Sequence, residues 1–371
     1  MLAIIIIFII SIYILISILM FIGLHCGSKK KNRKLHNFSI VVAVKNEATV
    51  IENLLKSLIK IDYPKEMLEI IIVDNGSNDG TENKILKFCN KYEHIKLLEM
   101  GNKKNKNFKG KLYALQQGIL KSNGEIILVT DGDCKVPPSW VRSYNSKFGK
   151  KIGLIAGNLS LIEKNREASL FVKIQALDWI FLQSIAAGTT GINLSVSMLG
   201  GNFAIRRETY NDIGGFEKLG FSIIEDMQLI QAVSKNKKWK VLYSSDNDLL
   251  VDTLPPVKFS EFIKQRKRWV MGSTDVSVWG IFLQITAVIN HLLIILGFLL
   301  PVSKLLLLGG ILSIFSVDFI LLFRQLARFK MKRLLLYFFH FELFYIFYTF
   351  IFLPVVLFSK KVEWKGEEYK V

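Results

Sequence analysis

The sequence has little cysteine and little histidine, and neither residue is spaced to hold a structural metal. Cys26, Cys89 and Cys134 are far apart and odd in number. This argues against a disulfide scaffold and fits a reducing compartment. The five histidines are scattered and predict no zinc site. The net charge of +18 is not accompanied by a nucleic-acid-reading motif, so we expect no nucleic-acid partner.

The first apolar run lacks both the basic start and the small-residue cleavage pattern of a signal peptide. Residues 2–24 carry no charge and are long enough to span a bilayer. We interpret them as an uncleaved anchor, with the N-terminus outside and the chain cytoplasmic from residue 29. Apolar runs at about 280–302, 304–323 and 334–358 predict about three C-terminal transmembrane helices. A re-entrant last segment stays open as an alternative.

Positive charge is concentrated beside these apolar runs. Residues 29–34 form one basic cluster, and a second lies between the third and fourth apolar runs: Arg324, Arg328, Lys330, Lys332 and Arg333. Such clusters mark cytoplasmic flanks and attract anionic lipid headgroups. We therefore expect a multi-pass protein in contact with membrane lipids, in the plasma (inner) membrane of a prokaryote.

These patterns predict five segments: an anchor at 1–28, a cytoplasmic domain at 36–257, an interfacial amphipathic helix at 258–275, membrane helices at 276–359 and a polar tail at 360–371. The run 171–185 carries an apolar stripe at helical spacing. Core packing and contact with a membrane surface are both open explanations for this stripe.

Three strand-like runs in the predicted cytoplasmic domain end in acidic or polar turns. Residues 38–44, 68–73 and 125–130 alternate with helical patterns, which indicates parallel βαβ units. Asp74 and Asp131 therefore fall at the carboxyl ends of strands, where ligands bind in open α/β sheets. With Asp133 beyond Gly132, Asp131 could hold Mg²⁺ or Mn²⁺ against phosphate oxygens. An ordinary Asp-Gly turn is the alternative.

Other polar residues at predicted helix starts have an ordinary structural explanation. Lys111 begins a predicted helix and could pair with phosphate, or it could be a solvated lysine. Glu225 and Asp226 also begin a predicted helix, where acidic residues are ordinary capping and dipole chemistry.

Residues 38–133 resemble the nucleotide-sugar half of family 2 glycosyltransferases of the GT-A fold. The matching pieces are Asn46-Glu47, the turn at 74–81, Gly110-Lys111 and Asp131-Gly-Asp133. Further along, Glu225-Asp226 and Gln265-Arg-Lys-Arg268-Trp269 are similar to the acidic pair and the Gln-x-x-Arg-Trp signature of membrane-bound members. One departure is Ala43-Val44-Lys45, where the family often has a proline before Asn-Glu.

The resemblance implies roles for these positions. Donor-binding residues would be Asn46, Glu47, Asp74, Lys111, Asp131, Asp133, Gln265, Arg268 and Trp269, with the metal on Asp131 and Asp133. Asp74 would lie near the nucleotide base, and Arg268 would offset leaving-group charge. Asp226, with its neighbour Glu225, would supply the general base that takes the acceptor's proton.

We therefore expect a GT-A domain, a mostly parallel sheet flanked by helices, with one N-terminal and about three C-terminal transmembrane helices. The expected activity is inverting transfer from a nucleotide-diphospho-sugar, by resemblance a UDP-sugar, to a lipid or lipid-linked glycan of the cell envelope. One alternative is a processive polysaccharide synthase of the cellulose, hyaluronan or chitin synthase type. An alternative of another class is a non-catalytic, membrane-anchored scaffold that binds sugar nucleotides.

Overall fold

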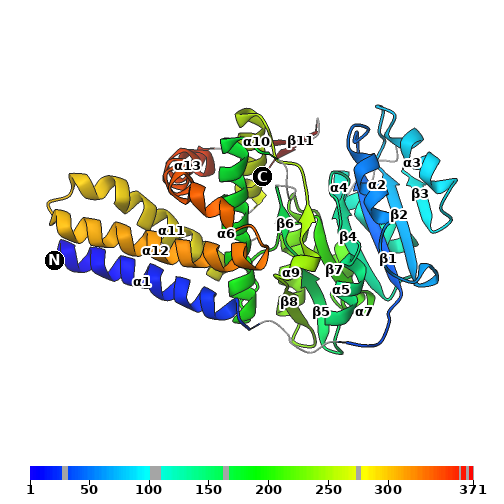
Figure 1. Ribbon diagram of the computed structural model, residues 1–371, viewed down its shortest axis with the longest axis horizontal. Coiled ribbons are helices and arrows are strands. Elements are labelled where there is room, and N and C mark those ends of the chain that lie inside the picture. The colour runs from blue at the N-terminus through cyan, green and yellow to red at the C-terminus, as the bar shows by residue number, and fades with distance from the viewer. Residues whose placement is uncertain are drawn as a thin grey trace. The chain divides into compact units, whose positions relative to one another are not determined.

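The computed structural model describes residues 1–26, 32–100, 110–161, 167–272, 277–358, 361–364 and 367–370. The chain forms two compact units, each built from segments that are separated in the sequence (Figure 1). The sheet unit contains Gly27–Ser160 and Met198–Leu254. The helix unit contains Met1–Cys26, Leu161–Ser197 and Pro255–Val371. The predicted 36–257 domain is thus divided, because residues 161–197 cluster with the helix unit.

A seven-stranded sheet forms the centre of the sheet unit. Its order is β3-β2-β1-β4-β7-β5-β8. β3, β2, β1 and β4 are parallel, β7 is antiparallel to both neighbours, and β8 is parallel to β5. The strands are β1 (Phe38–Val44), β2 (Leu68–Asp74), β3 (Ile95–Glu99), β4 (Ile126–Asp131), β5 (Ile152–Ala156), β7 (Asn202–Arg206) and β8 (Lys240–Tyr243). A short parallel pair joins β6 (Leu159–Ser160) to β9 (Val251–Asp252).

The central strands are apolar because they are buried on both faces, as expected for a parallel sheet. Register aligns their carboxyl ends: Val44 pairs with Asp74, and Ala43 pairs with Asp131. One edge of the sheet therefore carries the acidic residues that end β2 and β4.

Helices connect the strands of this sheet (Figure 1). They are α2 (Ile51–Leu58), η1 (Lys65–Met67), α3 (Thr81–Cys89), α4 (Gly110–Lys121), α5 (Trp140–Lys147), α7 (Arg207–Asp212), α8 (Gly215–Leu219), α9 (Glu225–Lys235) and η2 (Asn247–Leu249). α4 packs on β1 and β2. The contact is closest at Gly118, where a Cβ would lie 2.5 Å from Val41 Cγ1 and 2.8 Å from Val73 Cγ2.

We expect Gly118→Ala to destabilise the sheet unit by about 1–3 kcal/mol, because the added methyl overpacks two stiff, buried valines. In an open helix interior, Gly→Ala stabilises by about 1 kcal/mol, so the expected sign is reversed here. Gly309→Ala is the control, since no atom lies within 4 Å of its Cβ position. Thermal unfolding in detergent measures both variants. A Gly118→Ala protein as stable as the Gly309→Ala protein would contradict the close packing of α4.

Asn202, at the start of β7, lies where the parallel strands β3-β2-β1-β4 meet the strands β7-β5-β8. Its side chain is fully buried. Oδ1 accepts hydrogen bonds from Trp140 Nε1 at 3.0 Å and from Tyr144 Oη at 2.8 Å. Nδ2 donates to the carbonyl oxygens of Asn158 and Leu249, both at 2.7 Å. These four bonds fix the position at which the preceding Gly200-Gly201 turn enters the sheet.

Among the residues that the structure describes, the helix unit contains five helical segments that are long and apolar enough to cross a membrane. They are α1 (Leu2–Gly23), α6 (Leu170–Gly191), α11 (Val278–Leu296) with η4 (Gly297–Leu299), α12 (Lys304–Arg328), and η5 (Lys332–Tyr337) with α13 (Phe338–Phe358). The unit also contains α10 (Phe259–Gly272) and a hairpin of β10 (Lys361–Trp364) and β11 (Glu367–Lys370). The expected fold class, an α/β domain with N-terminal and C-terminal membrane helices, is confirmed.

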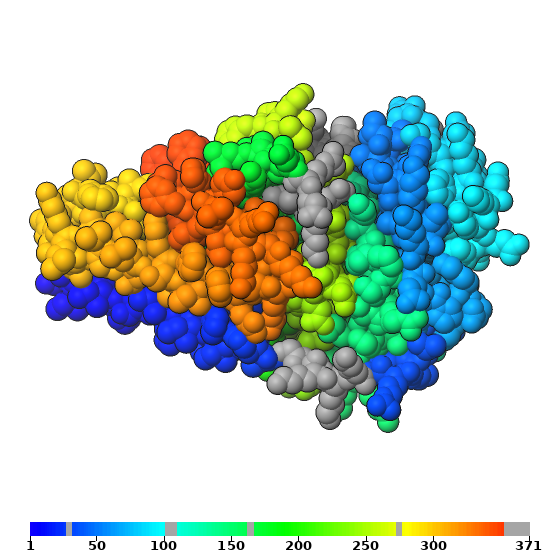
Figure 2. Space-filling view, viewed as in Figure 1, coloured from blue at the N-terminus to red at the C-terminus, as the bar shows by residue number. Residues whose placement is uncertain are grey.

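The long helices have two orientations within the helix unit. α1, α11 and α12 run side by side, whereas α6 lies across them and α13 is seen end-on (Figure 1). In Figure 2 the dark blue surface of α1 lies directly against the yellow and orange surface of α11 and α12. Large apolar side chains such as Phe8 on α1 and Leu312 on α12 are exposed. Outward apolar faces of this kind suit contact with lipid acyl chains.

The order of elements around α6 favours a helix that does not cross the membrane, despite its length and composition. A crossing helix delivers its two ends to opposite sides. α6 is the single long helix between β5 and β7, yet these two strands pair in one sheet. This pairing favours an arrangement in which both ends of α6 lie on the same side of the membrane. The apolar stripe of residues 171–185 is explained by packing, because α6 contacts α1, α12 and α13.

The C-terminal hairpin constrains α13 in the same way. β10 begins at Lys361, soon after α13 ends, and it contacts α10, which precedes α11. If α11, α12 and α13 all crossed completely, the chain after α13 would lie on the side opposite α10. The transverse orientation of α13 resolves this conflict and favours a re-entrant or in-plane last segment. Three helices, α1, α11 and α12, then have the geometry of membrane crossings.

α1 and α6 meet backbone to backbone through glycines. A Cβ at Gly23 would lie 1.9 Å from the carbonyl oxygen of Gly188, and one at Gly191 would lie 2.0 Å from the carbonyl oxygen of Gly23. Small residues are what allow membrane-embedded helices to approach so closely. We call this contact the glycine seam.

Candidate active site

The carboxyl edge of the sheet is shaped by the turn that follows β2. Asp74 is buried, and its Oδ1 accepts hydrogen bonds from Ser77 N at 2.9 Å and from Ser77 Oγ at 2.7 Å. Asn46 adopts a left-handed conformation with φ of 56° and accepts a hydrogen bond from Asn78 N at 3.0 Å. Glu47 N donates to Thr81 Oγ1 at 2.8 Å. The turn after β1 and the turn after β2 therefore form one hydrogen-bonded platform.

Lys111 connects the end of β4 to the start of α9. Its Nζ lies 2.7 Å from Asp131 Oδ1 and 3.0 Å from Glu225 Oε1. Burial would lower the pKa of this ammonium. The carboxylates of Asp131 and Glu225 outweigh burial and hold the pKa of Lys111 above its ordinary value. Lys111 is therefore charged at neutral pH, and it links residues that are distant in the sequence.

Asp133 lies in a strongly negative and largely buried place. Burial, together with the negative charges of Asp131 and Glu47, raises the pKa of Asp133 to about 6. Its Oδ2 accepts a hydrogen bond from Thr253 Oγ1 at 3.2 Å. Glu47 itself lies beside Gly132, where a Cβ would be 3.2 Å from Glu47 Cγ. Carboxylates held this close favour a cation among them.

Gly200 and Gly201 give the backbone close access to two carboxylates. A Cβ at Gly200 would lie 2.7 Å from Asp226 Oδ2, and one at Gly201 would lie 2.7 Å from Asp131 Oδ2. Gly201 also has φ of +85°, which favours glycine. Asp226 is buried at the N-terminal end of α9, and its Oδ1 accepts a hydrogen bond from Met227 N at 2.8 Å. This turn therefore brings Asp131 and Asp226 near one another.

The sheet unit thus brings together eight of the residues singled out from the sequence: Asn46, Glu47, Asp74, Lys111, Asp131, Asp133, Glu225 and Asp226. They come from the ends of β1, β2 and β4 and from the starts of α4 and α9. The remaining three, Gln265, Arg268 and Trp269, lie on α10 of the helix unit.

On α10 the most buried charged residue is Arg266, inside the Gln-x-x-Arg-Trp run. Its side chain is 1% exposed and forms an ion pair with Asp178 of α6. The guanidinium carbon lies 4.4 Å from the ring centroid of Trp269, which in turn lies 5.3 Å from that of Trp179. Trp269 is therefore fixed between a cation and a second indole.

We expect Arg266→Leu, which leaves the Asp178 carboxylate buried without a partner, to destabilise the helix unit by about 3–5 kcal/mol. The double variant Arg266→Leu/Asp178→Leu removes both charges and should recover most of that loss. The melting temperatures of the parent, the two single variants and the double variant, measured in detergent, give the coupling between the two residues. Additive losses in the double variant would show that the pair is not coupled.

Sequence patterns did not predict the Arg266–Asp178 ion pair or the four hydrogen bonds of the buried Asn202 side chain. Asp178 and Arg266 are 88 positions apart, so no spacing links them. The one available signal was an aspartate inside the apolar run 171–185, because a charge there requires a partner. A third missed feature, around His291, lies in the helix unit and is described below.

The fold and the acidic edge define a glycosyltransferase of the GT-A type. The family model for glycosyl transferase family 21 matches residues 3–371, and the chain belongs to that family. The resemblance inferred from the motifs is thereby confirmed.

Individual relatives are more distant. The chain is 28% identical over 253 residues to a probable glycosyltransferase, YdaM, of Bacillus subtilis, covering 67% of this chain and 58% of that one. It is 27% identical over 257 residues to a beta-monoglucosyldiacylglycerol synthase of Nostoc, covering 66% and 51%. It is 25% identical over 265 residues to a poly-beta-1,6-N-acetyl-D-glucosamine synthase of Staphylococcus epidermidis, covering 67% and 57%. The chain thus spans little more than half the length of these relatives.

Among solved structures, a mannosyltransferase from Pyrobaculum calidifontis in complex with GDP-Man and Mn²⁺ aligns with a TM-score of 0.57. The alignment covers 97% of this chain and 100% of that one at 15% identity. At this identity the similarity shows a shared fold.

Proposed function

We propose that this protein is an inverting glycosyltransferase. It moves a sugar from a nucleotide-diphospho-sugar, expected to be a UDP-sugar, to a lipid or lipid-linked glycan at the cytoplasmic face of the membrane. The observation that carries the proposal is the ion-paired cluster at the carboxyl edge of the sheet. There Lys111 contacts both Asp131 and Glu225, with Asp133 and Asp226 beside them.

The donor would bind across the platform formed by the turns after β1 and β2. Asp74 orders this platform through Ser77, and Asn46 and Glu47 connect its two turns. We assign the nucleotide base to the Asp74 side and the diphosphate to Lys111. Lys111 is charged and lies at the start of α4, so it suits a phosphate.

Asp131 and Asp133 fit a divalent cation, Mg²⁺ or Mn²⁺. They offer carboxylate oxygens, the ligands that such hard ions prefer, and burial together with the negative charges of Asp131 and Glu47 raises the pKa of Asp133. When bound, the ion would supply positive charge to the departing diphosphate. The mannosyltransferase with the same fold was solved with Mn²⁺ and GDP-Man.

Asp226 is the residue that we assign as general base. Glu225 is held by Lys111 and would position that lysine, whereas Asp226 Oδ2 lies at the Gly200 turn. Asp226 would take the proton of the acceptor hydroxyl as its oxygen bonds to the anomeric carbon. The bond from that carbon to the diphosphate oxygen breaks in the same step, and the nucleoside diphosphate leaves. A single displacement of this kind inverts the configuration.

On α10, we assign Arg268 to the leaving-group charge and Trp269 to one wall of the acceptor pocket, with Gln265 beside the donor. The packing of Trp269 against Arg266 and Trp179 supports a fixed indole surface. Arg324, Arg328, Lys330, Lys332 and Arg333, around the turn between α12 and α13, support a cytoplasmic location for that turn.

A lipid-type acceptor is favoured by the small number of crossings. With α6 and α13 transverse, three helices are few to enclose a pore for an extruded polymer. Relatives with names of both kinds are known, a glucosyldiacylglycerol synthase and a poly-N-acetylglucosamine synthase. The polymer synthase is therefore the second candidate.

The test uses purified protein in detergent with a lipid extract and a panel of sugar nucleotides. Release of nucleoside diphosphate is followed with Mn²⁺ and with EDTA. We expect release with one donor, dependent on both metal and lipid, and mass spectrometry of the lipid should show one added sugar. A long glycan product would favour the polymer synthase. No release with any donor would favour a binding scaffold.

A further inference from the structure

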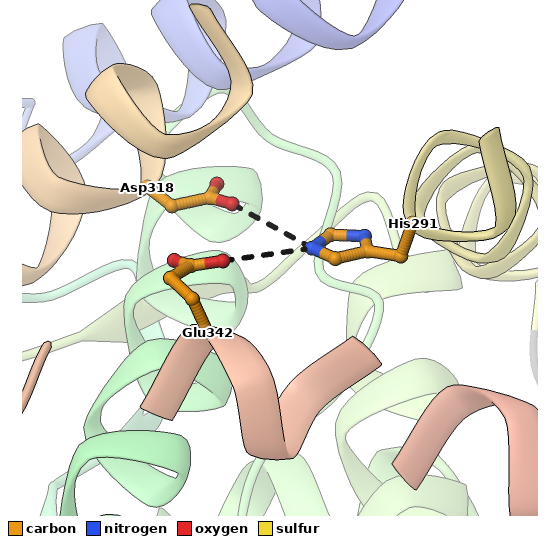
Figure 3. Close-up of side chains that lie close together, drawn as sticks. All are labelled: His291, Asp318 and Glu342. Carbon is orange, nitrogen blue, oxygen red and sulfur yellow. Dashed lines mark ion pairs between the residues drawn. The ribbon is translucent and has the colours of Figure 1, made fainter. Parts of the chain in front are cut away.

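Three groups that commonly ligate metals converge inside the helix unit. His291 lies on α11, Asp318 on α12 and Glu342 on α13, and their side chains point toward one another (Figure 3). His291 Nε2 lies 3.8 Å from Asp318 Oδ2 and 3.9 Å from Glu342 Oε2. One ligand atom from each residue lies within 4.8 Å of the other two. All three side chains are at most 1% exposed.

Two of these groups are oriented by further hydrogen bonds. His291 Nδ1 lies 2.8 Å from the carbonyl oxygen of Ala287, which can only accept, so Nδ1 carries the proton. In the neutral ring, Nε2 therefore presents its lone pair to the two carboxylates. Tyr13 of α1 donates to Asp318 Oδ1 at 2.7 Å, which leaves Oδ2 directed at His291. Bonds of this kind hold metal ligands in orientation.

Three atoms of this cluster lack a hydrogen bond to any residue that the structure describes. His291 Nε2 and both carboxylate oxygens of Glu342 have no hydrogen-bond partner among the described residues. The separations of 3.8 and 3.9 Å are too long for direct hydrogen bonds. An imidazole nitrogen and carboxylate oxygens thus face one another away from water, an arrangement that is costly unless a cation or a shared proton lies between them.

We propose that His291, Asp318 and Glu342 bind one divalent transition-metal ion, of the class of Zn²⁺ or Mn²⁺. A dipositive ion would neutralise the two carboxylates. Metal–ligand distances of about 2.0–2.2 Å place neighbouring ligands roughly 3.0–3.6 Å apart, so a small contraction of the cluster suffices. An imidazole nitrogen among the ligands favours a transition metal over Mg²⁺ or Ca²⁺, which prefer oxygen. The ion would fasten transverse α13 to α11 and α12.

This site is separate from the donor site and does not depend on the proposed transferase activity. The experiment therefore uses the full chain carrying Asp131→Asn/Asp133→Asn, which removes the other proposed metal ligands. The protein is incubated with Zn²⁺ or Mn²⁺ in detergent and passed over chelating resin. Retained metal is then counted by inductively coupled plasma mass spectrometry. We expect about one equivalent of one of these metals per chain, whether or not transfer activity is found.

Variants locate the ion. In the same background, Glu342→Gln keeps the side-chain shape and should lower metal retention at least tenfold. Tyr13→Phe removes only the bond that orients Asp318 and should weaken binding by about 10–100-fold. Ser316→Ala is the control on α12, because its hydroxyl bonds to Leu312 O of the same helix, and it should retain the metal. Size-exclusion profiles check that each variant is folded.

Two results would overturn the proposal. In the first, the folded Asp131→Asn/Asp133→Asn protein retains no more metal than the same protein carrying Glu342→Gln. The three groups would then share protons instead of binding a metal. In the second, the Glu342→Gln and Tyr13→Phe variants both retain as much metal as the protein without these substitutions. The metal would then be bound elsewhere.

Discussion

Asp226→Asn is expected to reduce turnover by about 10²- to 10⁴-fold, the usual contribution of a general base. An amide cannot accept the acceptor's proton, whereas its oxygen can still accept the hydrogen bond from Met227 N. The fold and donor binding should therefore survive. The measurement is the rate of nucleoside diphosphate release at saturating donor, together with nucleotide affinity by calorimetry.

Asp212→Asn is the matched control for that substitution. Asp212 is also an aspartate of the sheet unit, but its Oδ2 accepts hydrogen bonds from Lys238 Nζ at 2.8 Å and Trp239 Nε1 at 2.7 Å, outside the acidic cluster. Its turnover should stay within about twofold of the parent. If Asp226→Asn behaved like Asp212→Asn, Asp226 would not be the base.

Gly201→Ala is expected to cost both stability and activity. A side chain at φ of +85° is strained by about 1–2 kcal/mol. In addition, the new methyl would lie 2.7 Å from Asp131 Oδ2 and displace that carboxylate from Lys111. We expect at least a tenfold loss of turnover and a lowered melting temperature.

Gly220→Ala separates these two effects. Gly220 also has a positive φ, of +79°, but no atom lies within 4 Å of its Cβ position. It should share the loss of stability and keep its activity. Equal activity in the two variants would show that Asp131 tolerates the displacement or does not take part in transfer.

Local patterns in the sequence were sufficient for the sheet and its acidic edge. Buried parallel strands are apolar along their length, and the carboxylates that end them stand out. For this reason the positions of Asp74 and Asp131 at strand ends could be predicted. Their contacts could not be predicted, because the neighbours Lys111 and Glu225 are separated by more than a hundred residues and meet only through the order of strands.

Patterns were less informative for the helix unit. By composition and length, α6 and α13 look like membrane-crossing helices just as α1 does. Their orientation depends instead on where the chain must go after each helix ends. The pairing of β5 with β7 supplies that information for α6. The scattered histidines gave no zinc spacing, because the groups around His291 are carboxylates from two other helices.

The glycine seam has a consequence for the order in which the protein is made. α1 precedes its partner α6 in the chain, and strands β1 to β6 are synthesised between the two helices. Because Gly23, Gly188 and Gly191 allow backbone contact, α1 can receive α6 late without rearranging side chains. Co-translational insertion therefore leaves α1 in the bilayer with an unfilled glycine surface while half of the sheet emerges. The small residues at this contact therefore serve the assembly of α1 with α6.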